Sequence, residues 1–118
     1  MKMVRLTPPA ELNMAIGEAM FSQRQITRFK PDPVPREAIE KIIDAAIKAP
    51  SGGNTQPWHF VAITDRDLIA RIGGIYKELW LGARGTQAEP GETPVYRAAR
   101  YLANHMPDVP AMILICAD

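Results

Sequence analysis

Apolar residues recur at helical spacing in four stretches of the chain. The clearest stretch runs from Pro35 to Lys48 and carries an apolar stripe made of Ile39, Ile42, Ile43, Ala46 and Ile47. Residues three and four positions apart share one face of an α-helix, so this pattern predicts a helix. Similar spacing predicts helices over residues 8–20, from Asp65 to about Gly82, and over residues 94–105. We expect the Asp65 side chain to cap the third of these helices.

Two shorter apolar runs are typical of β-strands. Residues 58–64 are rich in aromatic and branched side chains and are bounded by turn-forming residues, and a second apolar run covers residues 111–117. Residues 84–93 form a polar loop between the third and fourth predicted helices. The order helix, helix, strand, helix, helix, strand predicts an α/β or α+β layer with only two sheet strands in this chain.

The last predicted strand ends at the final residue of the sequence, Asp118. A domain can end on a strand, but a hydrophobic strand without a closing helix also fits a truncated reading frame. Two strands rarely form a stable sheet by themselves. We therefore expect residues 1–118 to be the N-terminal part of a single larger domain.

Composition and charge exclude several classes of partner. The chain has 14 Lys and Arg against 13 Asp and Glu, and the net charge of +1 gives no electrostatic basis for binding nucleic acid or an anionic membrane. The longest apolar run is too short to span a bilayer, and the N-terminus lacks an apolar signal segment. The single cysteine, Cys116, excludes an internal disulfide and fits a reducing cytoplasm. We expect a cytoplasmic protein.

Several kinds of catalytic site lack their residues in this sequence. One cysteine and two histidines, His59 and His105, are too few and too scattered for a zinc site. There is no glycine-rich dinucleotide motif, no P-loop and no Gly-x-Ser-x-Gly nucleophile elbow. We therefore expect no metal site and none of the standard hydrolase, kinase or dinucleotide-fold sites.

Two arginines lie four residues apart where the first predicted helix ends. Arg24 and Arg28 can converge on one anion, because the planar guanidinium presents a fork of donors that matches phosphate. A solvated basic helix end that favours the helix dipole explains the same residues. The spacing alone leaves both interpretations open.

A loop with two glycines follows the second predicted helix, at residues 49–58. Glycine lets a backbone approach a flat ligand closely, and Ser51, Asn54 and Gln56 offer donors and acceptors together. Trp58 adds aromatic surface. An ordinary connection between a helix and a strand is an equally good interpretation of these residues.

Together the two stretches resemble the opening of a nitroreductase-family protein. The resemblance rests on the order Arg-x-Ile-x-Arg-Phe-x-Pro-Asp-Pro-Val-Pro, then a helix with an Ile/Ala stripe, then Ala-Pro-Ser-Gly-Gly-Asn-Thr-Gln-Pro-Trp-His-Phe. It is densest over residues 24–63 and continues more loosely to residues 109–115, which resemble the next core strand of the family. The Pro-Ser-x-x-Asn-x-Gln-Pro-Trp part is the more specific of the two motifs.

The resemblance implies an α+β, nitroreductase-like sandwich that binds FMN as a homodimer, with the flavin at the dimer interface. Arg24 and Gln25 fall where the early motif of the family meets the FMN phosphate and ribityl chain. A second set of implied cofactor-binding residues falls in the loop that reaches the flavin bound mainly by the partner subunit: Pro50, Ser51, Gly52 and Asn54.

Arg28 is the third candidate in the early motif, and it departs from the family pattern. Many members have a second basic residue directly after the hydrophobic residue of the motif, where this chain has Thr27. A cation near the flavin pyrimidine would stabilise the anionic reduced ring. On a helical segment a shift of one residue turns a side chain by about 100°, so the resemblance leaves open whether Arg28 reaches the flavin.

The implied reaction is ping-pong: NAD(P)H reduces the flavin, which then reduces a nitroaromatic, quinone or similar electron-poor molecule. No catalytic side chain is expected, His59 is expected to be structural, and the loop at residues 84–93 is either a substrate-side lid or disordered. One alternative is a truncated, non-catalytic nitroreductase-like module that assembles with itself or with a partner chain. Another is a different reaction at the same flavin site, such as dehalogenation.

Overall fold

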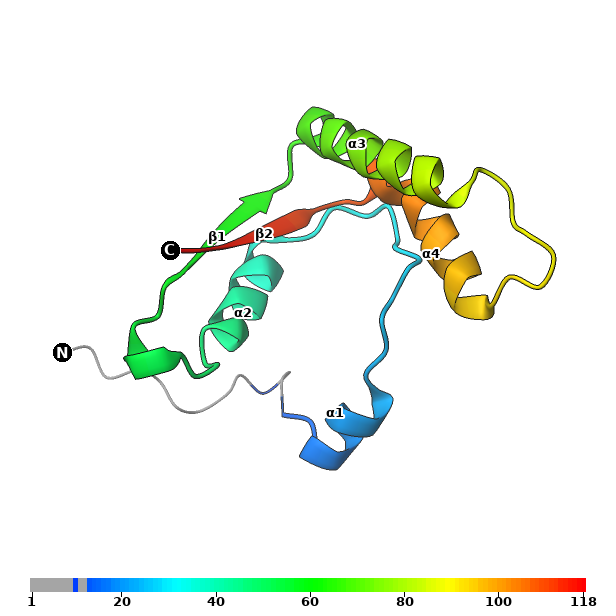
Figure 1. Cartoon of the computed structure of the whole chain (residues 1–118). Helices are drawn as coiled ribbons and strands as arrows, with labels where there is room; N and C mark the ends of the chain where they lie inside the picture. Colours follow the sequence, from blue (N-terminus) through cyan, green and yellow to red (C-terminus); the bar gives the residue numbers. More distant parts are fainter. Residues whose placement is uncertain (1–9, 11–12) are drawn as a thin grey trace.

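The structure is a computed structural model that describes residue 10 and residues 13–118, and its elements follow the predicted order (Figure 1). The described α-helices are α1 (Ile16–Ser22), α2 (Arg36–Ala46), α3 (Arg66–Arg84) and α4 (Pro94–His105). The strands are β1 (Trp58–Ile63) and β2 (Met112–Ala117), and short 3₁₀ turns occur at η2 (Gly52–Asn54) and η3 (Met106–Asp108). Helices beside a small antiparallel sheet confirm the predicted α+β class.

Strands β1 and β2 pair antiparallel, with Trp58 opposite Ala117 and Ile63 opposite Met112. Within the described part of the chain the sheet consists of these two strands. Each strand therefore has an outer edge whose backbone donors and acceptors have no strand partner there. Such edges favour pairing with further strands.

The core lies where β1 passes into α3 and where η3 passes into β2. Ile63, Ile69 and Val109 are buried there, and three partly buried residues pack against them: Ile72, Met106 and Met112. The guanidinium of Arg66 strengthens this junction, since it donates hydrogen bonds to the carbonyl oxygens of Asp108 and Val109. The start of α3 is thereby tied to the entry into β2.

Helices α3 and α4 both begin at side-chain caps. The Asp65 carboxylate accepts a hydrogen bond of 2.8 Å from the backbone N–H of Leu68, which confirms the predicted cap. Thr93 Oγ1 accepts from the N–H of Tyr96 at 3.4 Å, and Pro94 occupies the first turn of α4. Each side-chain oxygen satisfies a backbone donor that the helix itself leaves unpaired.

Helix α2 confirms the predicted element but buries only part of its apolar stripe. Ile39 is 6% exposed and Ile43 and Ile47 are half-buried, whereas Ile42 is 57% exposed. At the start of α2 the Glu40 carboxylate accepts a hydrogen bond from Arg36 Nε, and this bond raises the pKa of Arg36.

The first predicted helix differs most from the structure. Helix α1 begins at Ile16 rather than at residue 8, and residues 13–15 are not helical. The remainder of that predicted helix, residues 8, 9, 11 and 12, lies outside the described residues. Ala15 provides no side-chain cap, and short helices without tertiary packing are marginal in water. The apolar side chains of α1, among them Met20 and Phe21, are exposed.

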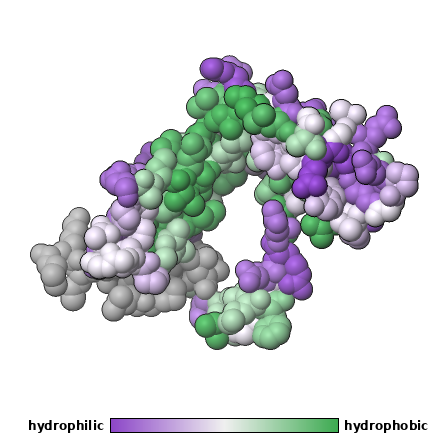
Figure 2. Space-filling model, in the orientation of Figure 1, coloured by the Kyte–Doolittle hydropathy of each residue, from purple (hydrophilic) through white to green (hydrophobic). Residues whose placement is uncertain are grey.

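The molecule is open rather than compact. Its radius of gyration is 17.5 Å, whereas a compact domain of this length has a radius of about 13–14 Å. Figure 2 shows apolar surface gathered over α3 and the two strands, and hydrophilic surface over the loop that follows α3. Exposed apolar residues on these elements include Val61, Leu68, Ile75, Leu79, Leu114 and Ile115.

Candidate functional site

The segment that holds Arg24, Gln25 and Arg28 is not helical. Helix α1 ends at Ser22, and residues 23–30 have no regular secondary structure. The first helix was expected to end before these arginines, and it does; Arg24 lies just beyond its end, whereas Arg28 lies farther along the chain. Ile26 and Thr27 are β-branched and disfavour a helix, and the prolines that begin at residue 31 prevent its continuation. Because this segment is not helical, a shift of one residue along it does not turn a side chain by the roughly 100° of an α-helix.

Arg24 caps the helix that precedes it. Its Nη1 donates hydrogen bonds to the carbonyl oxygens of Phe21, at 3.0 Å, and Gln23, at 2.6 Å. These bonds agree with the interpretation of Arg24 as a basic helix end, because carbonyl groups at a helix C-terminus attract a cation. The side chain is exposed, and so is neighbouring Gln25.

Arg28 contacts a different element from Arg24. Its guanidinium lies over the ring of Tyr101 in α4, 3.8 Å from the ring centroid. In this structure one arginine is therefore bound to the end of α1 and the other to the side of α4. Arg28 is also exposed.

The second candidate segment, around Ser51, is a tightly folded loop. Ser51 Oγ accepts a hydrogen bond of 3.0 Å from the backbone N–H of Gln56, and the N–H of Asn54 donates to the Ser51 carbonyl oxygen at 2.9 Å. The φ angles are positive at Gly53 (59°), Asn54 (56°) and Gln56 (51°). Left-handed backbone at non-glycine residues is strained and persists only where surrounding bonds hold it.

This folded loop exposes its backbone. Pro50, Gly52 and Asn54 are exposed, and Ser51 is half-buried. A Cβ built on Gly52 would meet no atom within 4 Å. The chain itself therefore does not require glycine at this position, which leaves room for another molecule to approach the backbone.

The two candidate segments do not meet in the described chain. In Figure 1 the light-blue segment after α1 runs toward α4, whereas η2 lies beyond the opposite end of the strands, at the far side of α2. Within one copy of the chain the two segments therefore do not form a single site. The cofactor contacts predicted for both segments stay predictions.

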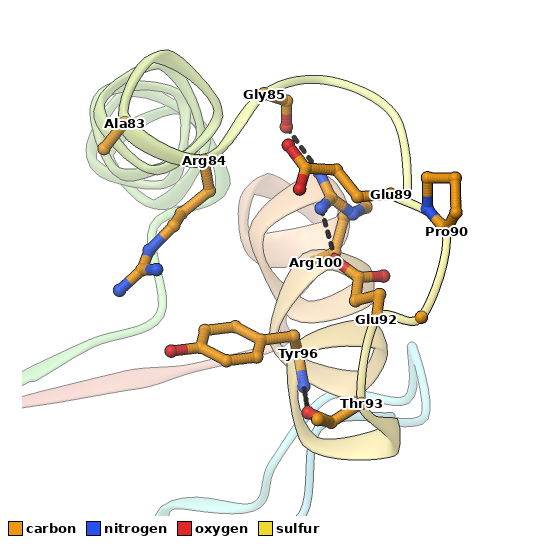
Figure 3. Close-up of a pocket in the computed structure, with 10 residues that line it drawn as sticks. Ala83, Arg84, Gly85, Glu89, Pro90, Glu92, Thr93, Tyr96 and Arg100 are labelled. Carbon is orange, nitrogen blue, oxygen red and sulfur yellow. Dashed lines mark hydrogen bonds and ion pairs between the residues drawn. The ribbon is translucent and has the colours of Figure 1, made fainter.

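A polar pocket that the sequence did not indicate lies between the end of α3 and the start of α4. Its volume is about 560 Å³. Arg100 crosses its base and donates hydrogen bonds to the Gly85 carbonyl oxygen and the Glu92 carboxylate (Figure 3). The Glu92 and Arg100 side chains are only 8% and 12% exposed. At the side of the pocket Arg84 lies over the Tyr96 ring.

Arg100 therefore fastens both ends of the loop at residues 84–93. No sequence pattern indicated this role of Arg100. Arg100 belongs to a helix and Glu92 to a loop, and the contact between them depends on the tertiary fold. The role of the loop as a substrate-side lid stays a prediction.

The predicted structural role of His59 is not tested by its single contact. His59 Nε2 lies 3.2 Å from Asp118 Oδ2, and both side chains are largely exposed. Among residue 10 and residues 13–118 there is no group of three or more His, Cys, Asp or Glu placed to hold a metal ion. None of the helices in this described part has the length and apolarity needed to cross a membrane.

Comparison with known proteins places these segments in a family. The family model described as "Nitroreductase family" matches residues 22–118. Iodotyrosine deiodinase of Danio rerio is 43% identical over 59 residues, which are 50% of this chain and 20% of that protein. The chain spans about a third or less of the length of the first curated relatives that it matches.

Solved structures show the same similarity. A BluB-like flavoprotein from Clostridium difficile 630 is 30% identical, with a TM-score of 0.55 over 86% of this chain and 48% of that chain. A variant of an FMN and NADPH-dependent nitroreductase derived from sphigopyxis sp. strain HMH is 25% identical, with a TM-score of 0.55 over 86% of this chain and 57% of that chain.

Proposed function

The chain belongs to the nitroreductase family, and we propose that its protein is an FMN-dependent oxidoreductase that uses NAD(P)H to reduce nitroaromatics, quinones or similar electron-poor small molecules. The observation that carries this proposal is that the family match includes both candidate segments in their proper order. Its structural neighbours include a flavoprotein and an FMN and NADPH-dependent nitroreductase.

The donors of the early segment fit the phosphate of FMN. Phosphate is recognised by guanidinium forks and by amide donors. Arg24 uses only Nη1 in its bonds to the end of α1, so its Nη2 and Nε donors remain available in the described structure. Gln25 is exposed beside it and adds a side-chain amide. We assign both residues to the phosphate and ribityl side of the site.

The loop at residues 50–54 fits the flat side of the flavin. Its strained backbone is held by the bonds of Ser51, and open space surrounds Gly52. A backbone that is both rigid and uncovered can approach an aromatic ring system without first reorganising. Because the two segments lie apart in one chain, we propose that each flavin is bound between two copies, as a homodimer.

The flavin supplies the hydride chemistry when bound, and the chain binds and orients it. We propose a ping-pong cycle in which NAD(P)H and the electron-poor substrate use the same space in turn. The side chains proposed here act by binding, and none of them needs to transfer a proton. We further propose that the protein is cytoplasmic, since the single cysteine fits a reducing compartment.

Flavin binding and turnover test this proposal directly. Purified protein mixed with FMN is expected to retain the flavin through gel filtration and to show its visible absorption bands. NADH or NADPH should bleach these bands under anaerobic conditions, and a nitroaromatic or quinone should restore them. Protein that retains no flavin would contradict the proposed function for this chain.

The exposed apolar surface favours one other function, a non-catalytic module that assembles with itself or with a partner chain. Two strands with open edges, and apolar residues such as Leu79 and Ile115 that are 70% and 71% exposed, support this alternative. Light scattering separates it from the enzyme when combined with the flavin assay. Oligomers that bind no FMN support the module, whereas FMN-loaded dimers support the enzyme.

A further inference from the structure

Arg28 contacts the face of an aromatic ring and makes no hydrogen bond among residue 10 and residues 13–118. Its guanidinium carbon lies 3.8 Å from the centre of the Tyr101 ring, well inside the range of a cation–π contact. A contact with the face of a ring provides no acceptor oxygen, so it leaves the N–H donors of the guanidinium available for one. Among residue 10 and residues 13–118 this stacking is the interaction that orients Arg28, and no hydrogen bond or ion pair competes for its donors.

Arg28 shares this arrangement with Arg84, which lies over the Tyr96 ring at 4.9 Å, and differs from Arg100 and Arg24, whose donors are in use. Arg100 also lies over a ring, that of Trp80 at 5.1 Å, but its donors bind Gly85 and Glu92. Arg24 spends Nη1 on the end of α1. A guanidinium that is oriented but not saturated is suited to bind an anionic oxygen in a fixed direction.

The Tyr101 ring also packs against a second ring of α4. Tyr101 is half-buried on α4, and the His105 ring stacks on it at a centroid distance of 4.2 Å and an angle of 32°. His105 Nδ1 in turn lies 3.5 Å from Asp108 Oδ2. A small cleft of about 80 Å³ lies beside Tyr101, where Thr27, Phe29 and Pro31 run along α4. The segment that carries Arg28 therefore follows α4 at the level of this ring.

We infer that Tyr101 is a positioning residue of the flavin site: its ring face orients the Arg28 guanidinium so that the N–H edge meets an anionic oxygen of FMN. This inference rests on the proposed function. It gives a role in cofactor binding to a residue of α4, which lies outside both cofactor motifs of the sequence. The oxygen belongs either to the phosphate or to the pyrimidine of the reduced flavin, and the experiment distinguishes these two sources.

The stacking can be measured without flavin. A ring face shields the protons that lie over it, so the side-chain NMR signals of Arg28 are expected upfield of those of exposed Arg36. Tyr101→Phe keeps the ring and should keep the shift, whereas Tyr101→Leu should abolish it. Arg28 signals at the same position as those of Arg36 in the unsubstituted protein would overturn the inference.

Flavin titration then tests the role of the ring. We expect Tyr101→Leu to weaken FMN binding by about three- to tenfold, the range that corresponds to loss of one partly exposed cation–π contact. Tyr101→Phe should bind FMN with the affinity of the unsubstituted protein. If the Tyr101 hydroxyl contributed to binding, this variant would bind FMN more weakly. Tyr96→Leu is the matched control, since it removes a ring of α4 that carries Arg84 instead, and it should not change FMN affinity.

Riboflavin, which lacks the phosphate, identifies the oxygen. If Arg28 meets the phosphate, Tyr101→Leu weakens the binding of FMN but not of riboflavin. If Arg28 meets the pyrimidine, both bind more weakly and the midpoint potential of bound FMN becomes more negative. FMN affinity unaffected by Tyr101→Leu, or lowered equally by Leu and Phe, overturns the positioning role alone. Failure of the unsubstituted protein to bind FMN overturns the proposed function and the positioning role with it.

Discussion

Gly73 of α3 and Pro107 of η3 approach each other so closely that no side chain fits between them. A Cβ built on Gly73 would lie 2.5 Å from the Pro107 nitrogen and 2.6 Å from the Met106 carbonyl carbon. All these atoms belong to backbone, which cannot move aside as a flexible side chain can. The contact joins α3 to the turn that leads into β2, and it therefore sets how closely α3 and η3 approach.

Gly73→Ala is expected to lower the free energy of unfolding by about 1–3 kcal/mol, the cost of overpacking a well-packed contact. Gly74→Ala is the matched control, since a Cβ there meets no atom within 4 Å. At that helix-interior position alanine should stabilise the protein by about 0.5–1 kcal/mol. Urea unfolding followed by circular dichroism measures both changes. If Gly73→Ala and Gly74→Ala changed the free energy of unfolding by the same amount and in the same direction, the contact between Gly73 and Pro107 would be absent in solution.

Gly52→Ala should show whether the loop at residues 50–54 binds the flavin or only connects a helix to a strand. The position is open in the chain itself, so the melting temperature should stay unchanged, while FMN binding should weaken because a methyl group obstructs approach of the ring system. Gly53→Ala provides the contrast. Its φ of 59° disfavours alanine, and the substitution should destabilise the fold by about 1 kcal/mol. Unchanged FMN affinity in the Gly52 variant would argue against contact between this loop and the flavin.

Arg24→Gln is expected to reveal the phosphate side of the site. Loss of a charge-assisted bond should weaken FMN binding by about tenfold, and riboflavin binding should be unaffected. Arg36→Gln is the control, because Arg36 is an exposed arginine of α2 whose Nε binds Glu40. Isothermal titration of both flavins against the two variants gives the comparison. If the variants at 24 and 36 behave alike, Arg24 serves only the end of α1.

Arg100→Gln should release the loop at residues 84–93. The substitution leaves the buried Glu92 carboxylate without its cation, at a cost of about 3 kcal/mol, and it removes the bond to the Gly85 carbonyl oxygen. Hydrogen exchange of the loop amides is expected to accelerate. Arg97→Gln is the milder control, because exposed Arg97 donates only to the Glu92 carbonyl oxygen. Equal exchange rates in the two variants would show that Arg100 does not fasten the loop.

The local pattern of the sequence predicted most element boundaries. Helix α4 spans residues 94–105 as expected, and α3 begins at its predicted cap, Asp65. Both follow from short-range chemistry, namely capping oxygens and apolar residues at helical spacing. Where such signals were weak the prediction was wrong. Helix α1 starts at Ile16, without a side-chain cap, rather than at residue 8.

Sequence motifs identified the two candidate segments, but they did not predict which side chains these segments contact. The spacing of Arg24 and Arg28 left open whether they converge on one anion. The structure places Arg24 at the end of α1 and Arg28 on Tyr101, far along the chain. The roles of Tyr101 and Arg100 had no signal in the sequence. Each depends on contacts between segments whose separation in sequence gives no regular pattern.

By itself, the sequence determined the helices, the strands, the glycine-rich loop and the family to which these motifs point. Those features follow from interactions between residues a few positions apart, and such interactions can be predicted from residue type and spacing. Only the tertiary structure decided that Gly73 touches Pro107, that Arg100 holds both ends of its loop and that Arg28 lies over the ring of Tyr101. Contacts of that kind depend on how finished elements pack, and packing is set by the whole chain at once.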